Sequence, residues 1–406
     1  MKCRHCGSEL QLPFIDLGTA PPSNAYVTRE QLHQPERWYP LRVSVCETCW
    51  LVQTEDYVGA GDLFTDDYAY FSSVSTTWLR HARDYVDAMC DRLRLGPESL
   101  VVEIAANDGY LLQYVQQRGI PCYGIEPTKS TASAAREKGI EIVEAFFRKQ
   151  LAADLAEKGR QADLVVANNV LAHVPDINDF VAGVARLLKQ RGVATFEFPY
   201  LLNLVRENQF DTIYHEHYSY LSLTAVARIF KANGLAVVDV EHLPTHGGSL
   251  RVFAQRSAAA KAGKAVDAIL AQECELGVKD PAFYAGFQPH AEASKNALLG
   301  FLLEEKRAGR KVSAYGAAAK GNTLLNFAGI RSDLLPYVVD RNASKQGRYL
   351  PGSRIPIVDE AHLMADQPDW ILILPWNLRA EIEQQLAAVR RWGGRFVQAM
   401  PKMELL

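Results

Sequence analysis

Seven apolar runs, separated by helical patterns, lie between residues 75 and 255 and constrain the fold more than any other feature. Strands that alternate with helices form βαβ units, and successive units build a parallel sheet. The last two runs lie close together on either side of His246-Gly247-Gly248, which predicts a terminal strand pair. The predicted strands cover residues 100–105, 122–126, 140–145, 163–168, 193–199, 235–240 and 250–255.

A second alternating series follows a helical stretch at residues 256–309, with strands expected at 311–315, 337–340, 370–374 and 395–398. Residues 1–60 contain several prolines that interrupt any long helix, so we expect a short, loop-rich unit there. The chain is therefore predicted to be an α/β protein of three units. These are a small N-terminal unit (1–65), a central Rossmann-like unit (66–256) and a C-terminal Rossmann-like α/β unit with leading helices (257–406).

The charge balance excludes some classes of function. The chain has 44 basic and 47 acidic side chains, whereas a nucleic-acid surface usually needs a basic excess. No run approaches the roughly 20 apolar residues of a membrane span. The basic N-terminal residues are not followed by the apolar stretch of a secretory signal. We therefore expect a cytoplasmic protein with no nucleic-acid partner and no membrane partner.

Two Cys-x-x-Cys pairs near the N-terminus predict a metal site. They are Cys3 with Cys6 and Cys46 with Cys49. Four thiolates suit tetrahedral zinc in a closed structural site, which braces a fold and does no chemistry. The alternatives are two unrelated reduced pairs or one redox pair. The other three cysteines lie in apolar or helical surroundings, which is typical of small buried side chains.

The turn after the first central strand indicates a nucleoside-containing cofactor. Glu103 lies in this strand, and Glu126 ends the next, where an acid can accept hydrogen bonds from both ribose hydroxyls. Ala105 and Asn107 stand where a dinucleotide fingerprint has glycines, and only Gly109 remains. This pattern favours S-adenosylmethionine over a dinucleotide. A generic Rossmann turn without this cofactor is the alternative.

The segment 210–222 has the highest density of reactive side chains. It is followed by a predicted helix, because the apolar residues at 223–230 share one face, Ser222 is a suitable N-cap and Gly234 a suitable stop. The segment then lies in a loop at the carboxyl edge of the sheet, where open parallel sheets bind ligands. His215 and His217 allow a metal site as an alternative, but no third ligand accompanies them at a recognisable spacing. A polar surface loop is the other alternative.

Six motifs in one order give the chain a specific resemblance. They are the paired cysteines and residues 103–112, 214–217, 246–251, 315–323 and 339–342. With these motifs the chain resembles the nucleotide-sugar C-methyltransferases of deoxysugar biosynthesis, which add a branch methyl at C-3 of a 4-keto sugar. The resemblance covers nearly the whole chain, and residues 163–174 also resemble the fourth strand and following loop of methyltransferases.

The resemblance implies roles for individual residues. Zinc is expected at the four cysteines, and His217 matches the general base, with Tyr214 and Glu216 beside it. Tyr68 matches a tyrosine that contacts the cofactor. Asn169 and His173 match positions that line the cleft; we assign Asn169 to the cofactor and His173 to the substrate, a 4-keto-deoxysugar on a nucleoside diphosphate.

The chemistry requires a base, because a sugar carbon is not by itself a nucleophile. A ketone at C-4 acidifies the hydrogen at C-3, so a neutral imidazole can remove it and leave an enolate whose carbon attacks a methyl sulfonium. Glu216 or Tyr214 is expected to orient the imidazole or to bind the developing oxyanion. The sequence leaves open which of them does which.

The C-terminal unit is expected to form the other wall of the cleft. The turn at 315–321 has alanines in place of fingerprint glycines, which disfavours a second redox cofactor. We expect the sugar nucleotide near four side chains: Ser249, Arg251, Lys320 and Asn322. Solvated charges at Arg251 and Lys320 are the alternative.

Two other functions compete with this prediction. One is O- or N-methylation of the same ligand class, with His217 removing a proton from a hydroxyl or an amine. The other is a zinc-ribbon protein that binds or modifies nucleic acid, which the acidic balance disfavours. The enzymes that the chain resembles favour a monomer.

Overall fold

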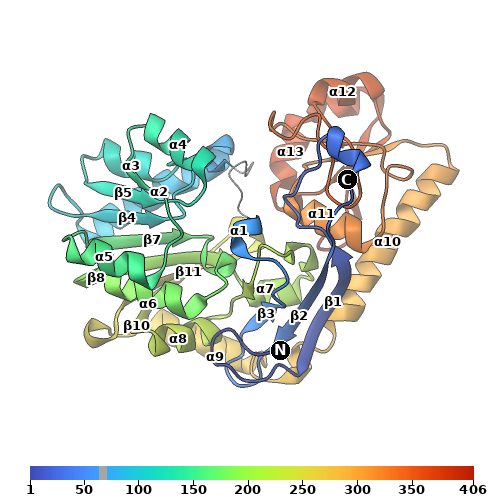
Figure 1. Cartoon of the computed structure of the whole chain (residues 1–406). Coiled ribbons are helices and arrows are strands. Elements are labelled where there is room, and N and C mark those ends of the chain that lie inside the picture. Colours follow the sequence, from blue (N-terminus) through green and yellow to red (C-terminus); the bar gives the residue numbers. More distant parts are fainter. Residues whose placement is uncertain (64–70) are drawn as a thin grey trace.

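The computed structural model describes residues 1–63 and 71–406, which form three sheets with their covering helices (Figure 1). The central sheet and the C-terminal sheet form two lobes, and strands β1 and β2 of the N-terminal unit run along the C-terminal lobe. The α/β class with a Rossmann-like centre, predicted from the sequence, is confirmed.

The central sheet has seven strands in the order β10-β11-β8-β7-β4-β5-β6. Five strands are parallel, while β11 pairs antiparallel with both β8 and β10, as predicted for the terminal pair. The strands are β4 (Val101–Ile104), β5 (Cys122–Ile125), β6 (Ile142–Val143), β7 (Ala162–Asn168), β8 (Leu188–Pro199), β10 (Leu235–Leu243) and β11 (Ser249–Arg256).

Both faces of this sheet are covered, which explains the nearly continuous apolar runs in its inner strands. Val101 and Leu164 pack with α2, α3 and α4, whereas their neighbours Val102 and Val165 pack with α5, α6, α8 and α9 on the other face. The helices are α2 (Thr76–Leu93), α3 (Leu112–Gln117), α4 (Lys129–Glu137), α5 (Lys149–Glu157), α6 (Ile177–Leu187), α7 (Leu201–Arg206), α8 (Leu223–Ala232) and α9 (Lys264–Glu275).

Helix α8 begins and ends at the residues that the sequence indicates. The Ser222 hydroxyl accepts a hydrogen bond from the Ala225 amide at 3.1 Å. Gly234 follows the helix with a φ of +84°, which a residue with a side chain rarely adopts. Two further amides at the start of the helix, those of Leu223 and Thr224, donate to the buried carboxylate of Glu273 on α9, each at 2.7 Å. The cap therefore joins two helices directly after the reactive loop.

The N-terminal unit contains a sheet that the sequence did not predict. Its antiparallel strands are β1 (Leu12–Ala20), β2 (Tyr39–Val45), β3 (Val52–Thr54) and β9 (Ser219–Tyr220), and α1 (Ala60–Leu63) follows β3. The expectation of a short, loop-rich unit left this sheet out, because two register irregularities interrupt the alternation along β1. In addition, the fourth strand, β9, comes from a distant part of the chain.

The C-terminal sheet has the order β14-β13-β12-β15-β16-β17. The four predicted strands are present, and two strands of only two residues each, too short for a sequence pattern, are added at the edges. The strands are β12 (Val312–Tyr315), β13 (Val338–Val339), β14 (Ile357–Val358), β15 (Trp370–Ile373), β16 (Arg395–Gln398) and β17 (Glu404–Leu405). The helices are α10 (Phe287–Arg307), α11 (Ala319–Phe327), α12 (Glu360–Asp366) and α13 (Arg379–Gln385).

The N-terminal and C-terminal units share one hydrophobic core. Phe14 on β1 stacks on Phe287 of α10 with ring centroids 4.4 Å apart, and Val43 and Ala314 belong to the same buried cluster. The boundary expected after residue 256 coincides with the end of β11, whereas the one expected after residue 65 lies outside the described residues.

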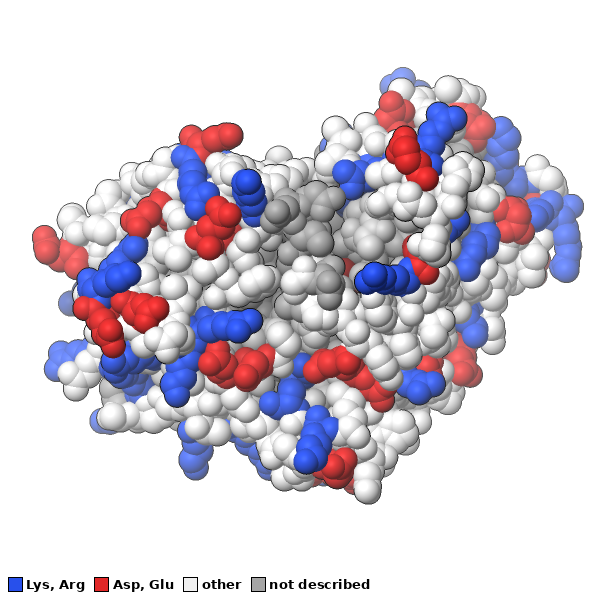
Figure 2. Space-filling model, in the orientation of Figure 1, with Lys and Arg blue, Asp and Glu red and all other residues white. Residues whose placement is uncertain are grey.

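On the face drawn in Figure 2, basic and acidic side chains are interspersed, without a stripe of one sign among the described residues. None of the described helices is both long enough and apolar enough to span a bilayer.

Replacement of Glu273 tests the cap on α8. We expect Glu273→Ala to destabilise the protein by about 2–3 kcal/mol, because two buried amides lose a charged acceptor. Urea unfolding followed by circular dichroism measures this change. Glu275→Ala, at an exposed position on the same helix, is the control and should change the midpoint little. Equal midpoints for the two variants would contradict this account of the cap.

Candidate active site and metal centre

The four cysteines converge on one point. Cys3 and Cys6 precede β1, Cys46 and Cys49 lie in the turn between β2 and β3, and all four Sγ atoms lie within 4.8 Å of one another. A zinc ion with Zn–S bonds of about 2.3 Å separates its sulfurs by about 3.8 Å, so the cluster fits tetrahedral zinc. The Gln53 amide donates to Cys3 Sγ at 3.2 Å, as an outer-sphere partner of a metal ligand would.

The turn after β4 follows the backbone path of a glycine-rich loop, although Ala105 and Asn107 stand where such a loop has glycines. Ala105, Asn107 and Gly109 have φ values of +56°, +49° and +74°. At Gly109 a Cβ atom would lie 2.4 Å from the Ile140 side chain, so glycine is required there. The turn therefore keeps the close, left-handed path that lets a backbone approach a ligand.

The groups around this turn fit a polar cofactor. Both amide atoms of Asn168 and Oδ1 of Asn169, at the end of β7, are buried without a hydrogen-bond partner among the described residues. The Glu126 carboxylate accepts hydrogen bonds from the Asn107 and Thr128 amides at 2.9 Å each. Burial raises the pKa of Glu103 well above its usual value and also raises the pKa of Glu126. Tyr68 lies outside the described residues.

His217 is held from both ring nitrogens. Its Nδ1 donates to the Thr212 carbonyl at 2.9 Å, and the Tyr214 hydroxyl lies 2.8 Å from Nε2. Because a carbonyl only accepts, the neutral ring carries its proton on Nδ1, and Nε2 accepts from Tyr214. Thr212 ends the short 3₁₀ helix η4 (Phe210–Thr212), which follows α7 in the loop after β8.

Several groups keep His217 neutral. Burial lowers its pKa well below the usual value, and the charges of His173, Lys320 and His246 act in the same direction. The ring of His173 packs edge-on against it, with centroids 4.6 Å apart, and Tyr220 lies on another side with centroids 6.2 Å apart. The structure thus surrounds the imidazole with groups that disfavour an imidazolium.

The Glu216 carboxylate and Nδ1 of His173 bond to groups other than the His217 ring. The Glu216 carboxylate accepts from the backbone amide and the side-chain amide of Asn24, at 3.1 and 3.2 Å. His173 donates from Nδ1 to the Glu216 carbonyl at 2.7 Å, and burial lowers its pKa to about 4. Tyr214, rather than Glu216, therefore contacts the imidazole.

Of the four expected substrate residues, Lys320 is the one whose charge contributes to the lowered pKa of His217. Its ammonium donates to the Asn377 side-chain oxygen at 3.1 Å and lies 4.5 Å from the centre of the Trp376 ring. Asn322 instead donates to the Ser23 carbonyl at 2.6 Å, and Ser249 donates to the Thr245 carbonyl at 2.9 Å.

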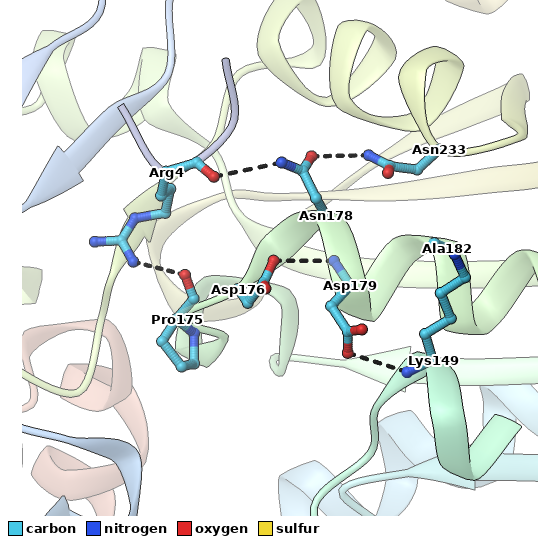
Figure 3. A pocket seen from close by; sticks show the side chains of 8 residues that line it. All are labelled: Arg4, Lys149, Pro175, Asp176, Asn178, Asp179, Ala182 and Asn233. Carbon is cyan, nitrogen blue, oxygen red and sulfur yellow. Dashed lines mark hydrogen bonds between the residues drawn. The ribbon is translucent and has the colours of Figure 1, made fainter. Parts of the chain in front are cut away.

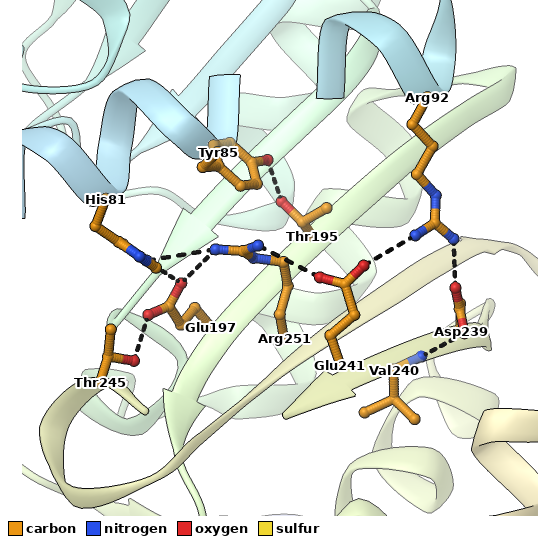
Figure 4. A network of polar contacts seen from close by, with 10 residues as sticks. All are labelled: His81, Tyr85, Arg92, Thr195, Glu197, Asp239, Val240, Glu241, Thr245 and Arg251. Atoms are coloured by element: carbon orange, nitrogen blue, oxygen red, sulfur yellow. Dashed lines mark hydrogen bonds and ion pairs between the residues drawn. The ribbon is translucent and has the colours of Figure 1, made fainter. Parts of the chain in front are cut away.

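Arg251 is bound into a buried network (Figure 4). Its guanidinium donates to Glu197 at 3.1 Å and to Glu241 at 3.4 Å. Glu197 also accepts from His81 at 2.9 Å and from Thr245 at 2.9 Å. Two carboxylates therefore compensate this cation within the protein, and the network joins α2 to strands β8, β10 and β11.

The sequence analysis missed three residues of the site. Trp376 donates from Nε1 to the buried carboxylate of Asp211 at 2.7 Å, and Asn24 holds Glu216. Trp376 and Asp211 follow strands β15 and β8 along the chain, so their place after a strand was a usable signal. Asn24 lies in a proline-containing loop with no comparable signal.

A separate hollow of about 570 Å³ lies beside the first cysteine pair (Figure 3). Arg4, Lys149, Asn178 and Asn233 are among its lining residues, and most of its polar groups bond to one another. None of the predicted site residues lines it.

Family models match three consecutive segments of the chain. They are a zinc binding domain at residues 3–64, a methyltransferase domain at 78–240 and a C-methyltransferase C-terminal domain at 244–401. The C-methyltransferase NovU of Streptomyces niveus is 34% identical over 406 residues, which are 100% of this chain and 96% of that protein. The chain belongs to the C-methyltransferase family.

Other similarities cover part of the C-methyltransferase. A ubiquinone biosynthesis O-methyltransferase of Methylobacterium sp. (strain 4-46) is 26% identical over 196 residues, which are 43% of this chain and 77% of that protein. The crystal structure of magnesium protoporphyrin IX methyltransferase from Synechocystis PCC 6803 with bound SAM matches 45% of this chain and 82% of that chain. That match has 18% identity and a TM-score of 0.33.

The family and the observed groups agree on the cofactors of this C-methyltransferase. S-adenosylmethionine is its methyl donor, and the turn at 105–109 with the unpaired amide of Asn168 and Oδ1 of Asn169 suits a polar nucleoside ligand. Zinc is its structural metal, held by the four-cysteine cluster.

Removal of one metal ligand tests the zinc site. We expect Cys46→Ser to lose the bound zinc and to lower the melting temperature by about 10 °C, because metal binding contributes directly to the folding free energy. Metal analysis and thermal unfolding measure the two effects. Cys274→Ser, at an exposed cysteine outside the cluster, should leave both unchanged. A zinc-loaded Cys46→Ser protein of normal stability would contradict the assignment.

The charge state of His217 can be measured without a substrate. The lowered pKa means that the ring is neutral above that pKa and becomes protonated only as the pH falls through it. We expect NMR of the histidine-labelled C-methyltransferase to show His217 still neutral at pH 6, with its signal assigned by its absence in His217→Asn. A midpoint at or above the ordinary 6.5 would contradict the environment described here.

Proposed function

We propose that the C-methyltransferase adds a methyl group to C-3 of a 4-keto-deoxysugar carried on a nucleoside diphosphate, with His217 as the general base. One observation carries the proposal. The hydrogen bond from Nδ1 to the Thr212 carbonyl leaves Nε2 with its lone pair, on a buried ring whose pKa is lowered. A base that is neutral at physiological pH is what removal of a proton next to a ketone needs.

The reaction follows from the groups around that ring. Nε2 takes the proton from C-3, and the electron pair of the C–H bond moves into an enolate whose oxygen was the C-4 carbonyl oxygen. S-adenosylmethionine supplies a methyl group bound to a positively charged sulfur, and the enolate carbon attacks the carbon of that methyl group.

Tyr214 and Glu216 take different parts in this proposal. The Tyr214 hydroxyl bonds to Nε2 and must leave it when a substrate hydrogen takes that place, so it orients the base before substrate binds. Glu216 holds the loop against Asn24 and is a positioning residue. Asn169 lines the donor side, and His173 packs on the base.

The cellular setting stays a prediction. A cytoplasmic location, a monomeric state and a nucleotide sugar as the sole partner were expected from the sequence and the resemblance. Size-exclusion chromatography with light scattering measures the oligomeric state directly.

Replacement of His217 tests the proposed reaction. Wild-type protein, offered a panel of nucleoside-diphosphate 4-keto sugars with S-adenosylmethionine, should give a product heavier by one methylene unit in mass spectrometry. We expect His217→Asn to lower turnover by about 10²–10⁴, the range for loss of a general base, and to bind S-adenosylhomocysteine as tightly as wild type. His33→Asn, at an exposed position, is the control.

Deuterium from the solvent separates carbon methylation from the alternative. Wild-type protein without a methyl donor should exchange the hydrogen at C-3 in deuterated buffer, because only a carbanion exchanges it. Methylation without any exchange would indicate an oxygen or nitrogen acceptor and would sink the proposal. Near-wild-type turnover of His217→Asn would refute the choice of base.

A further inference from the structure

The ammonium of Lys320 is compensated at a distance by the carboxylate of Asp211, and by no directly bonded acid among the described residues. It lies in the first turn of α11, directly after the turn that follows β12. Its Nζ donates to Asn377 and lies over the Trp376 ring, and it forms no ion pair with a carboxylate in the described part of the chain. An ammonium has three N–H donors, so at least one is left for a ligand. Burial lowers the pKa of Lys320, as expected for a cation removed from water.

The surroundings keep this ammonium in place without neutralising it. Trp376 contacts Lys320 with its ring face and Asp211 with its Nε1, so the acid lies beyond the indole. The Trp376 ring packs closely against Gly247, in the turn before β11. A Cβ atom at this glycine would lie only 2.4 Å from the ring. By contrast, two carboxylates, those of Glu197 and Glu241, compensate the charge of Arg251 within the protein. A half-buried cation with no directly bonded carboxylate favours an anion beside it.

Lys320 lies near the loop of His217, because Trp376 contacts its ammonium and also donates to Asp211, the residue directly before Thr212. Thr323, one turn further along α11, donates to the Ile213 carbonyl of the same loop at 2.8 Å. Lys320 has electrostatic effects on two rings there. Its charge contributes to the lowered pKa of His217 and to that of His246, which falls to about 4. It is therefore close enough to both rings to act on charge that develops beside them. A cation in this place keeps the base neutral before the reaction and attracts negative charge during it.

We propose that Lys320 is a catalytic residue that donates a hydrogen bond from Nζ to the enolate oxygen formed when His217 removes the proton. The inference rests on the proposed function. As the C–H bond breaks, its electron pair forms the C=C bond, and the carbonyl π pair moves onto the oxygen next to Nζ. When the new C–C bond forms, that pair returns to the carbonyl, the sulfur–methyl bond breaks and a neutral thioether leaves. Lys320 stays protonated throughout.

This assignment differs from a role in ground-state binding. A lysine that only holds the phosphates of the substrate would raise KM and leave kcat unchanged, whereas an oxyanion donor acts mainly in the transition state. The two roles are therefore separable by kinetics, even though both need a cation in the same cleft.

The test compares Lys320→Gln, Lys320→Met and Lys320→Arg with wild type. The probe is the nucleoside-diphosphate 4-keto sugar of the panel that wild-type protein methylates, in deuterated buffer without donor for exchange at C-3 and with donor for kcat and KM. We expect the two neutral variants to lose about 10²–10³ in both the exchange rate and kcat, the usual effect of removing one oxyanion donor, with KM changed by less than about threefold. Lys320→Arg keeps the charge and should lose less.

Two controls separate this role from misfolding. Lys320→Met keeps the apolar part of the side chain against Trp376. Its exchange rate and kcat therefore test the role if Lys320→Gln does not fold. Both neutral variants should bind S-adenosylhomocysteine as wild type does. Lys306→Gln, which removes an exposed lysine on α10 paired with Asp333, should leave all rates unchanged.

The outcomes distinguish the two proposals. Wild-type exchange rates in Lys320→Gln, or a rise in KM alone, would overturn the role of Lys320 and leave the base assignment standing. An absence of exchange in wild-type protein, or full exchange in His217→Asn, would overturn the proposed function itself.

Discussion

The pairing of β9 with β3 is the contact on which the site depends. β9 begins two residues after His217 and is the fourth strand of the N-terminal sheet, with Tyr220 opposite Val52. The Thr54 hydroxyl, at the end of β3, donates to the His217 carbonyl at 3.2 Å. β3 in turn follows the turn that carries Cys46 and Cys49. A metal at the four cysteines thus braces the strand that pairs with the loop carrying His217.

The three units of the chain meet at one loop. Residues 23–26 of the N-terminal unit donate from Asn24 to Glu216 and accept from Asn322 at the Ser23 carbonyl. Tyr26 donates to the Ala317 carbonyl at 2.6 Å, at the turn that leads to Lys320. Neighbouring residues of this one loop therefore contact both the reactive loop and the C-terminal lobe. The site is thus built from all three parts of the sequence.

Burial shapes the chemistry of this cleft more than ion pairing does. His173, His217 and His246 all have lowered pKa values with burial as the main cause, while Glu103 and Glu216 have raised ones. Burial favours neutral imidazoles, which accept protons. It also strengthens the attraction between the ammonium of Lys320 and any anion formed beside it. Arg251 and Glu197, which form an ion pair, lie outside this set and join structural elements instead.

Local patterns determined much of this protein. Alternating apolar runs predicted the two Rossmann-like sheets, two cysteine pairs predicted the zinc site, and the segment 210–222 indicated the loop that carries His217. These features repeat at fixed short spacings, because strand, helix and ligand geometry impose them on neighbouring residues. Only the tertiary structure decided the partners: Asn24 for Glu216, Thr54 for His217 and Trp376 for Lys320. Such contacts join residues far apart in the chain, and a single hydrogen bond or ring contact leaves no period in the sequence.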